Sequence, residues 1–437
     1  MQLPSRAAFR LIKECYNNRP TYLIRTAVSH DIISEPLSIF DNSITHALSK
    51  IIYSVGEGGL LHLLRSLPLK FGGWGIPHHM GSVSERHIIL SRIHTLSFVT
   101  DHIHNLLSTA TNMFIWPEII IGKFEQVDEE SKMDMEAYHG LTLANAKGVT
   151  AKGLYNIYKF QFNTLITGLR EDRSKAPMAA SLLSREGAYY PSIYLSNSRG
   201  INEETERQFF TDEEFVLALR NDAGISPTEL NSNRDHKCRC NSVHKPQVKY
   251  SHGLDCSSTR GLRIARHHIL RDYLANAIKK MFPEANIRKE YKIGVIGESD
   301  VIMDIVVDIG LHCYYIDLAV VHPGAESYLN LNVSSHRNQL SASGYEEANK
   351  RRHYRRVVPA VNPVCLVPFV IEASGRLGRS AKEFLDTIGV NHSVCVNRLL
   401  REVSFICARF RGKMLNDTLK GYVLVQGGGI GNPNIFF

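Results

Sequence analysis

The stretch Ile302–Pro323, IMDIVVDIGLHCYYIDLAVVHP, contains two runs of strand-forming residues joined by a short turn. β-Branched and aromatic residues dominate both runs, and Asp308 to His312 supply the turn, so the stretch predicts a β-hairpin. Each run has one aspartate at its centre, Asp304 in the first and Asp317 in the second. If the runs pair around this turn, the two aspartates lie nearly opposite each other.

Two opposed carboxylates in a sheet require a physical explanation. Directly opposite side chains lie about 4.5–5.5 Å apart at Cβ, where like charges are destabilising. Burial of an unpaired carboxylate adds a further penalty or raises its pKa. A divalent cation removes both penalties, and Mg²⁺ takes oxygen ligands while keeping positions for water and a phosphate. The hairpin is therefore interpreted either as a Mg²⁺ site aimed at a phosphodiester, or as a hairpin in which one aspartate ends its strand or faces solvent.

The segments on both sides of the hairpin predict a compact α/β domain from about residue 260 to residue 415. A helix is expected before the hairpin, because apolar residues recur there on one helical face: Ile269, Leu270, Tyr273, Leu274, Ala277, Ile278 and Met281. A basic helix (345–356), a strand (364–372) and two further helices follow the hairpin. The predicted order is helix, strand, strand, helix, strand, helix.

Charged residues around the hairpin are candidates for the same site. Glu290, between the first helix and the hairpin, could supply a third carboxylate. Arg266 and His267 lie at the beginning of the first helix, and Lys350 lies on the basic helix. Any of these could be plain surface charge. The run KRRHYRR is typical of a solvated face or of a phosphate-contacting patch, in which the candidate nucleic-acid contacts are Arg351, Arg352, Arg355 and Arg356.

Three of the eight cysteines cluster with a histidine. Cys238-x-Cys240 is followed by His252-x-x-x-Cys256 within nineteen residues. Zn²⁺ takes four such ligands in a tetrahedron, and a polar loop without a core of its own needs a bound metal to stabilise its fold. Because four protein ligands leave no position for water, the predicted role is structural. The alternative is three unrelated surface cysteines, and the spare candidate ligands are His236 and His244.

Composition restricts the class of protein. The 437 residues are 43% hydrophobic and 22% charged, as in soluble globular proteins of two or three domains. The net charge of +8 and a pI near 9.0 favour an acidic partner such as nucleic acid. The sequence contains no signal peptide and no apolar run long enough to span a bilayer, and the sparse cysteines favour a reducing, intracellular compartment.

The first half of the chain reads as mainly helical. Apolar periodicity predicts helices near residues 9–15, 40–52 and 89–103, with a glycine-rich loop over 65–81. Residues 170–210 are polar and weakly periodic, which indicates a linker or an irregular connection. Thr211 and Glu214 have the spacing of a capping box at the beginning of the next helix.

Taken in order, these features resemble one family. The run CxC…HxxxC, then RHH (266–268), a glutamate, an aspartate, IDLAVV (316–321) and a later lysine with Tyr354 resemble the C-terminal zinc knuckle and restriction-like endonuclease of site-specific non-LTR retrotransposons. YLIRT (22–26) and LPLKFGGWGI (67–76) resemble the region after the fingers and palm of the reverse transcriptase of the same elements. FTDEEFVLALRNDAGIS before the knuckle and FVIEASG after the hairpin extend the resemblance, in patches, along almost the whole chain.

The resemblance implies a fold and a domain order. It implies a mainly α N-terminal part plus an α/β C-terminal domain of restriction-endonuclease-like, PD-(D/E)xK type. The implied regions are a thumb-like helical region (1–110), a helical or irregular linker region (111–230), a zinc knuckle (231–258) and the endonuclease domain (259–437).

The resemblance also implies an activity. Asp304 and Asp317 would bind catalytic Mg²⁺ with Glu290 as a possible helper, and Lys350 would stand in for the motif lysine. Arg266 and His267 would match the basic pair at the start of the domain, and structural Zn²⁺ would be held by Cys238, Cys240, His252 and Cys256. The expected function is nicking of a DNA target in the nucleus, with element RNA as a second candidate partner.

The sequence departs from the family pattern at three places. Met303 replaces the usual proline before Asp304, Leu318-Ala319 follows Asp317 where x-Lys is standard, and His268 replaces an asparagine. The polymerase aspartate pair is missing, so the chain is expected to be a truncated reading frame or the tail of a polyprotein that does not polymerise DNA. Two alternatives to an active nuclease therefore stay open: a catalytically dead nucleic-acid-binding scaffold, as in a central splicing factor with a similar pairing of domains, and a decayed element remnant.

Overall fold

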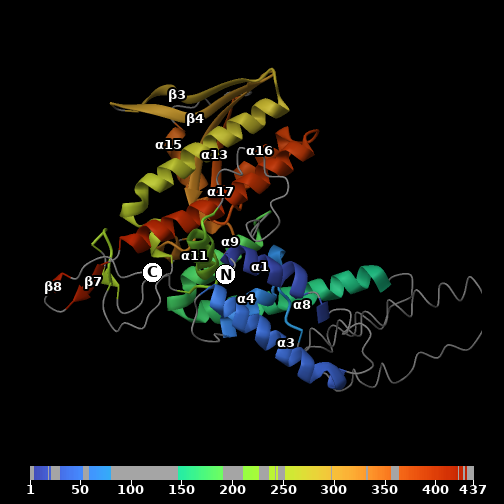
Figure 1. Cartoon of the computed structure of the whole chain (residues 1–437). Coiled ribbons are helices and arrows are strands. Elements are labelled where there is room, and N and C mark those ends of the chain that lie inside the picture. The colour runs from blue at the N-terminus through green and yellow to red at the C-terminus, as the bar shows by residue number, and fades with distance from the viewer. Residues whose placement is uncertain are drawn as a thin grey trace, which may run out of the picture.

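The structure is a computed structural model and is mostly helical, with a four-stranded mixed sheet in the C-terminal part (Figure 1). It describes residues 4–17, 19–20, 30–52, 59–79, 146–189, 210–225, 236–241, 243–244, 251–296, 298–330, 333–355, 364–421, 423–426 and 429–430. The predicted helix at 89–103, the YLIRT segment (22–26) and Arg356 lie outside the described residues.

The helices of the first half pack around one apolar cluster, core 1. They are α1 (Ser5–Arg10), η1 (Leu11–Tyr16), α3 (His30–Ile51), α4 (Gly59–Ser66), η2 (Leu69–Phe71), α8 (Ala146–Glu171), η5 (Arg173–Lys175), α9 (Ala176–Glu186) and α11 (Asp212–Asp222). Core 1 contains Phe9, Trp74 and Phe215, whose rings make edge-to-face contacts around Phe9. Phe405, from the last long helix of the chain, also belongs to core 1. Helices from the two predicted regions 1–110 and 111–230 thus share one core.

The glycine-rich loop after α4 is confirmed where the structure describes it. Gly72 has φ of 74°, in the left-handed region that favours glycine, and ends η2. Gly73 lies so close to Leu67 that an added Cβ would be 2.1 Å from the Leu67 carbonyl oxygen. This tight turn buries Trp74 completely.

The predicted linker over 170–210 is wrong for its first part. Residues Ala176–Glu186 form α9, and nine of the eleven, from Ala176 to Arg185, are buried apart from Ser181. Their small side chains give a weak apolar period in the sequence, although Leu182 and Leu183 belong to core 1. The following helix α11 begins as predicted, because Thr211 and Glu214 form a capping box with Glu214 N donating to Thr211 Oγ1 at 3.2 Å and Thr211 N to Glu214 Oε2 at 3.1 Å.

The central sheet has the strand order β3-β4-β5-β6. Its strands are β3 (Asn286–Ile296), β4 (Ser299–Ile309), β5 (His312–Val321) and β6 (Val364–Glu372). The first three are antiparallel neighbours, and β6 is parallel to β5. The β5–β6 crossover contains α14 (Glu326–Leu329) and α15 (Ser341–Tyr354).

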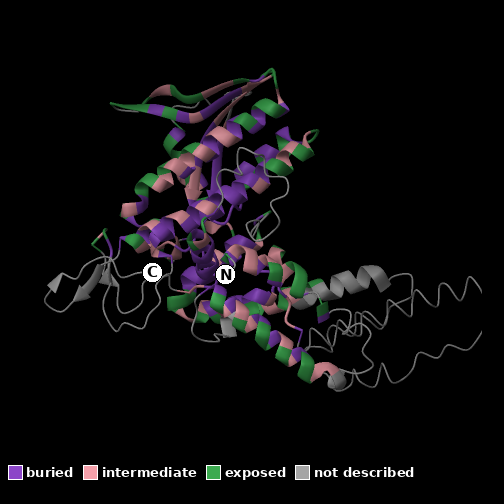
Figure 2. Cartoon of the chain, viewed as in Figure 1, coloured by how far each residue is buried: buried purple, intermediate pink, exposed green. Residues whose placement is uncertain are grey.

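Helices cover both faces of this sheet. On one face, α13 (Arg260–Met281), α16 (Arg379–Ile388) and α17 (Ser393–Lys420) form core 2 with Ile305, Ile316 and Phe369. On the other face, α15 places Tyr354 against Met303 and Val306. Burial is concentrated where the helices meet the sheet, while the far end of the β3–β4 ribbon is largely exposed (Figure 2).

The predicted hairpin, the helix before it, the basic helix and the two final helices are confirmed. β4 and β5 pair around a turn at Gly310, with Asp308 opposite Cys313 and Ile309 opposite His312. The predicted order was wrong in one respect, because β3 is an additional strand before the hairpin. β3 lies at the sheet edge and no residue from Asn286 to Val295 is buried, so the sequence lacks the alternation that marks a half-buried strand.

The cysteine cluster lies between the two halves of the chain. It is built from β1 (His236–Lys237), β2 (Val243–His244), α12 (His252–Asp255) and η7 (Ser257–Thr259). A second small sheet of order β2-β1-β7-β8 joins it to β7 (Val423–Gln426) and β8 (Gly429–Ile430). Among the described residues, no helix is long and apolar enough to cross a membrane.

Candidate functional site

Asp304 and Asp317 lie next to each other on β4 and β5. The β4–β5 ladder runs from Ile309 opposite His312 to Ile305 opposite Ile316, so the next residues along the strands are the two aspartates. Asp304 Oδ2 accepts a 2.7 Å hydrogen bond from Leu318 N, which brings its carboxylate to the backbone of β5 beside Asp317. This is the arrangement that the hairpin pattern predicted.

Each carboxylate has a basic partner from a helix on the sheet. His267 Nε2 of α13 lies 2.9 Å from Asp304 Oδ1, and Lys350 Nζ of α15 donates to Asp317 Oδ2 at 2.7 Å. The Asp304 side chain is 18% exposed and that of Asp317 9%. The two predicted groups His267 and Lys350 therefore converge with the aspartates in a half-buried cluster, the carboxylate site.

The surroundings move the two carboxyl pKa values in opposite directions. Burial would raise the pKa of Asp304, but the hydrogen bond and charge of His267, the Leu318 N–H and a hydrogen bond from Asp317 lower it below its usual value. Burial raises the pKa of Asp317, against the opposing charge of Lys350 and with a further rise from the Asp304 charge. Because the two groups are adjacent, they titrate as a pair, in which the Asp304 charge contributes to the raised pKa of Asp317.

Tyr354 completes the carboxylate site. Its hydroxyl is hydrogen-bonded to Asp317, and burial together with the Asp317 charge raises the pKa of Tyr354. Tyr354 lies four residues after Lys350, one helical turn further along α15, so both reach the same carboxylate. The sequence pattern singled out this tyrosine only through the family resemblance, and the spacing on a helix was the signal that could have placed it.

Glu290 does not join the carboxylate site. It lies in β3 and forms an ion pair with Arg271 of α13, and its side chain is 60% exposed. Its φ of 49° lies in the left-handed region and is unusual for a residue other than glycine. Among the described residues, the cysteine cluster is the only set of three or more His, Cys, Asp or Glu side chains whose ligand atoms all lie within 4.8 Å of one another.

The predicted nucleic-acid contacts divide into two groups. Arg266 is buried, so its guanidinium is not available to a phosphate, and this prediction from the family pattern is corrected. The residue faces Cys407 inside the protein, because position 266 lies on the α17 side of α13. By contrast, Arg351 and Arg352 near the end of α15 and Arg355 just after it are exposed, and Arg351 also donates to Ser380 Oγ of α16 at 2.8 Å.

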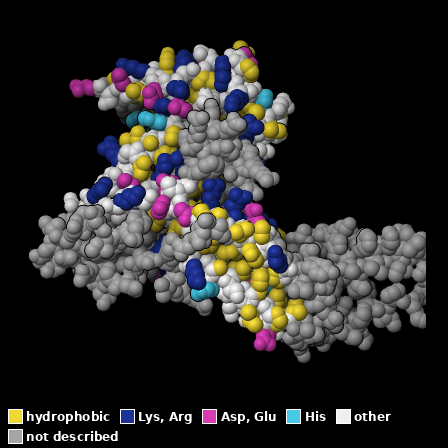
Figure 3. All heavy atoms as spheres, in the orientation of Figure 1, with side chains coloured by type: hydrophobic (Ala, Val, Ile, Leu, Met, Phe, Trp, Pro, Cys, Tyr) yellow, Lys and Arg dark blue, Asp and Glu magenta, His cyan; other side chains and the backbone are white. Residues whose placement is uncertain are grey.

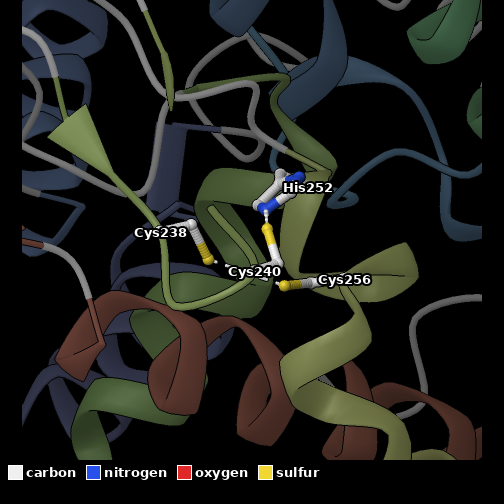
Figure 4. A group of neighbouring side chains, drawn as sticks. All are labelled: Cys238, Cys240, His252 and Cys256. Atoms are coloured by element: carbon white, nitrogen blue, oxygen red, sulfur yellow. Dashed lines mark hydrogen bonds between the residues drawn. The ribbon is translucent and has the colours of Figure 1, made fainter. Parts of the chain in front are cut away.

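The candidate metal centre consists of the four predicted ligands (Figure 4). Cys238 Sγ lies 3.5 Å from Cys256 Sγ, and Cys240 Sγ lies 3.4 Å from His252 Nε2. Ligands about 2.3 Å (sulfur) and about 2.0–2.1 Å (nitrogen) from a tetrahedral Zn²⁺ lie about 3.5–3.8 Å from one another. The four side chains therefore fit a metal such as zinc. His236 and His244 face each other in the backbone pairing of β1 and β2.

Local backbone structure explains how the closely spaced ligands Cys238 and Cys240, and His252 and Cys256, reach one site. A turn after Cys238 is closed by Asn241 N, which donates to the Cys238 carbonyl at 2.8 Å, and Asn241 has φ of 67°. His252 begins α12 and Cys256 follows it one turn later, with Cys256 N donating to the His252 carbonyl at 2.9 Å. Burial raises the pKa of Cys238 to about 12, so this thiol stays protonated until a metal replaces its proton.

The metal centre ties together three parts of the C-terminal region. Arg263 of α13 donates to the Cys256 carbonyl at 2.8 Å, and Leu254 of α12 is buried in core 2. His322 Nδ1, just after β5, lies 2.7 Å from Asp255 Oδ2. The four side chains would fill all the tetrahedral positions of a bound metal such as zinc.

No protein-family model matches the chain, and no curated protein is significantly similar to it. Function is therefore inferred from the carboxylate site and the metal centre alone.

The face in Figure 3 shows mixed charges around β3, β4 and α13, and hydrophobic side chains gathered over the region of α1, α3 and α4.

Proposed function

We propose that this protein is a metal-dependent DNA endonuclease with a restriction-like, PD-(D/E)xK-type domain. The observation that carries the proposal is the pair Asp304 and Asp317, opposed on neighbouring strands, with Lys350 Nζ 2.7 Å from Asp317. The order α13, β3, β4, β5, α15, β6, with β6 parallel to β5, supports the same fold type.

The donor set fits Mg²⁺, because both acidic groups offer oxygen ligands and the carboxylates keep lone pairs beyond those used by their partners. When bound, the ion would supply a Lewis acid and a more acidic water. Asp304 and Asp317 would hold it. His267 orients Asp304, and Tyr354 orients Asp317.

Lys350 has the role expected of the motif lysine. Its side chain is 15% exposed, and its ammonium group lies at the Asp317 carboxylate, where it would offset charge on the nonbridging oxygens of a bound phosphodiester. Arg352 and Arg355, both exposed at the C-terminal end of the same helix, would contact flanking phosphates, with Arg351 beside them at Ser380. The proposed setting is the nucleus, where the nick would prime reverse transcription by the polymerase of a retrotransposon-type polyprotein.

The experiment is nicking of supercoiled plasmid in the presence of Mg²⁺. We expect wild type to nick and Asp317→Ala to lose at least about 100-fold in rate, because it removes one of two ligands of the ion. Asp308→Ala is the matched control in the same hairpin, since Asp308 pairs with Arg288 away from the site. Equal nicking by wild type and Asp317→Ala would rule out the proposed site.

A second candidate function is a catalytically dead nucleic-acid-binding scaffold. The observation that favours it is that both carboxylates already have basic partners, His267 and Lys350. It predicts salt-dependent binding of DNA or RNA without cleavage in any divalent metal. A decayed element remnant, the third alternative, predicts instead that the purified chain folds poorly and unfolds without cooperativity.

A further inference from the structure

The helix that carries Lys350 is docked mainly through polar groups. The buried residues of α15 are Ala342, Ser343, Glu347 and Tyr354. Only Ala342 and Tyr354 belong to apolar clusters on this face of the sheet. Polar contacts therefore have to determine where α15 lies along the sheet, and Glu347 is the only buried acidic group among the four.

Glu347 caps the helix next to it. Its Oε1 accepts from Ser380 N at 3.1 Å and its Oε2 accepts from Ser380 Oγ at 2.9 Å. Ser380 is the second residue of α16, a ten-residue helix, so the carboxylate lies at the positive end of that helix. Arg351, one turn after Glu347, donates to the same Ser380 Oγ at 2.8 Å. Such charge-assisted hydrogen bonds are stronger than neutral ones.

Gly378 leaves room for this carboxylate. A Cβ added at Gly378 would lie 2.3 Å from Glu347 Oε1, a distance that no real contact shows. The φ of Gly378 is −64°, which any residue adopts, so space and not backbone conformation favours glycine here. Gly378 N donates to the Val370 carbonyl of β6 at 2.8 Å, which fixes the α16 terminus to the sheet.

We propose that Glu347 is a positioning residue that sets the place of α15 along α16 and β6, and thereby holds Lys350 at Asp317. Lys350 follows Glu347 by three residues, about 4.5 Å along the same face of the helix. β6 pairs with β5 so that Pro368 lies beside Asp317. The position of α15 along β6 therefore also sets the position of Lys350 relative to Asp317. The catalytic consequence rests on the proposed function, whereas the placement of Lys350 does not.

Competitive acetylation of lysines, followed by mass spectrometry, tests the placement without any activity. In wild type, Lys350 is shielded by Asp317, and Lys289, which is 47% exposed in its pair with Asp272, is the internal reference. We expect Glu347→Ala to increase acetylation of Lys350 relative to Lys289 about tenfold, the effect of losing about 1.4 kcal/mol of anchoring. Glu346→Ala, which alters the neighbouring half-buried glutamate of the same helix, is the matched control and leaves the ratio unchanged.

Gly378→Ala is the second variant, since it displaces the Glu347 carboxylate without changing any charged group. It should also increase the acetylation of Lys350 relative to Lys289. The double variant with Glu347→Ala should show no further increase over Glu347→Ala alone. Unchanged acetylation in both single variants, or an equal rise at Lys289 in a chain with a lower thermal midpoint, overturns the placement.

Plasmid nicking with Mg²⁺ tests the catalytic consequence. Glu347→Ala should lower kcat at least about tenfold with KM for DNA changed less than about twofold, because misplacement of a catalytic group acts on the transition state. Glu347→Gln keeps an acceptor for Ser380 N and should stay within about threefold of wild type. A normal kcat in Glu347→Ala overturns this half of the proposal, and a wild type that never nicks overturns it together with the proposed function, while acetylation still decides the placement.

Discussion

At the scale of single residues, the two aspartates of the carboxylate site have basic partners on other elements. Asp317 is paired with Lys350 of α15, and Asp304 with His267 of α13. A buried charge without a partner is strongly destabilising, so these pairs are required wherever the aspartates are enclosed. The sequence pattern identified the aspartates, and the helices supply the groups that make their burial possible.

Glu372, at the end of β6, is less well compensated and gives a prediction on pH. Its Oε1 accepts from Ser343 Oγ at 3.1 Å, and burial raises its pKa, although a hydrogen bond from Ser184 and the charge of Arg376 act in the opposite direction. A raised folded pKa means that the folded state binds this proton more tightly than the unfolded chain does. The contribution to stability is therefore complete below the unfolded pKa, about 4.3 for glutamate, and is lost as pH rises through the folded value.

Glu372→Gln imitates the protonated group, so we expect it to be more stable than wild type at pH 8 and equal to it near pH 4. Urea unfolding at both pH values measures the difference. Glu383→Gln, on the exposed side of α16, is the control and should show no such pH dependence. A Glu372→Gln variant that loses stability at pH 8 would contradict the assignment of a destabilising buried charge.

At the scale of elements, the two errors of the sequence reading have one cause. The edge strand β3 has no buried residue from Asn286 to Val295, and the buried helix α9 is built from small residues. Neither shows the contrast between an apolar and a polar face on which periodicity depends. In contrast, the apolar face of α13 was predicted residue by residue, because its core side is strongly apolar, although the helix begins at Arg260 and not at Arg266 as predicted.

The metal centre gives a prediction for the element that it forms. We expect one equivalent of zinc per wild-type chain and less than about 0.2 in Cys256→Ser, because loss of one of four ligands removes most of the affinity. Metal content after extensive dialysis is measured by plasma mass spectrometry. Cys15→Ser changes an exposed cysteine outside the centre and should retain the metal.

Removal of the metal by a chelator should also make the segment from Cys238 to Cys256 accessible to proteases. In the part of the segment from Cys238 to Cys256 that the structure describes, the apolar cluster at the metal centre contains little besides the cysteines, so it is expected to depend on the metal. Limited proteolysis should then cleave within this segment. Resistance to proteolysis that is unchanged by a chelator would show that the segment does not depend on the metal.

At the scale of the whole molecule, α17 joins the two cores. Phe405 and Ala408 belong to core 1, whereas Val403 and Phe410 belong to core 2. The first half of the chain therefore packs directly on the C-terminal domain, and α11 lies against α17, where an added Cβ on Gly412 would be 2.4 Å from the Glu214 carbonyl oxygen. The helical half and the candidate nuclease domain are expected to unfold together.

A buried cluster at this junction tests that expectation. Asp222 of α11 lies 3.2 Å from Arg185 of α9 and 3.2 Å from Arg411 of α17, and all three side chains are at most 3% exposed. Asp222→Ala leaves two buried guanidinium groups without their shared counter-charge and should cost about 3–5 kcal/mol. Urea unfolding should show one transition at lower urea for the whole chain.

Asp386→Ala, on the exposed side of α16, is the control and should change the free energy of unfolding by less than about 0.5 kcal/mol. Two separate transitions in Asp222→Ala, with only one of them shifted, would show that the two cores unfold independently.

Features that depend on local spacing could be predicted from the amino-acid sequence. These are the hairpin with its two aspartates, the apolar face of α13, the capping box at Thr211 and the set of four metal ligands. Each is encoded within about twenty residues, by periodicity, turn chemistry or ligand spacing.

Which charged groups pair with each other could not be predicted, because it depends on how distant elements pack. Lys350 and Asp317 are 33 residues apart, as are Ser380 and Glu347, and nothing local distinguishes them from the exposed charges beside them. This packing also turned Arg266 inward and Glu290 toward Arg271. A charged side chain has no periodic signature of its own, so its partner is chosen only when helices and strands from distant parts of the chain pack together.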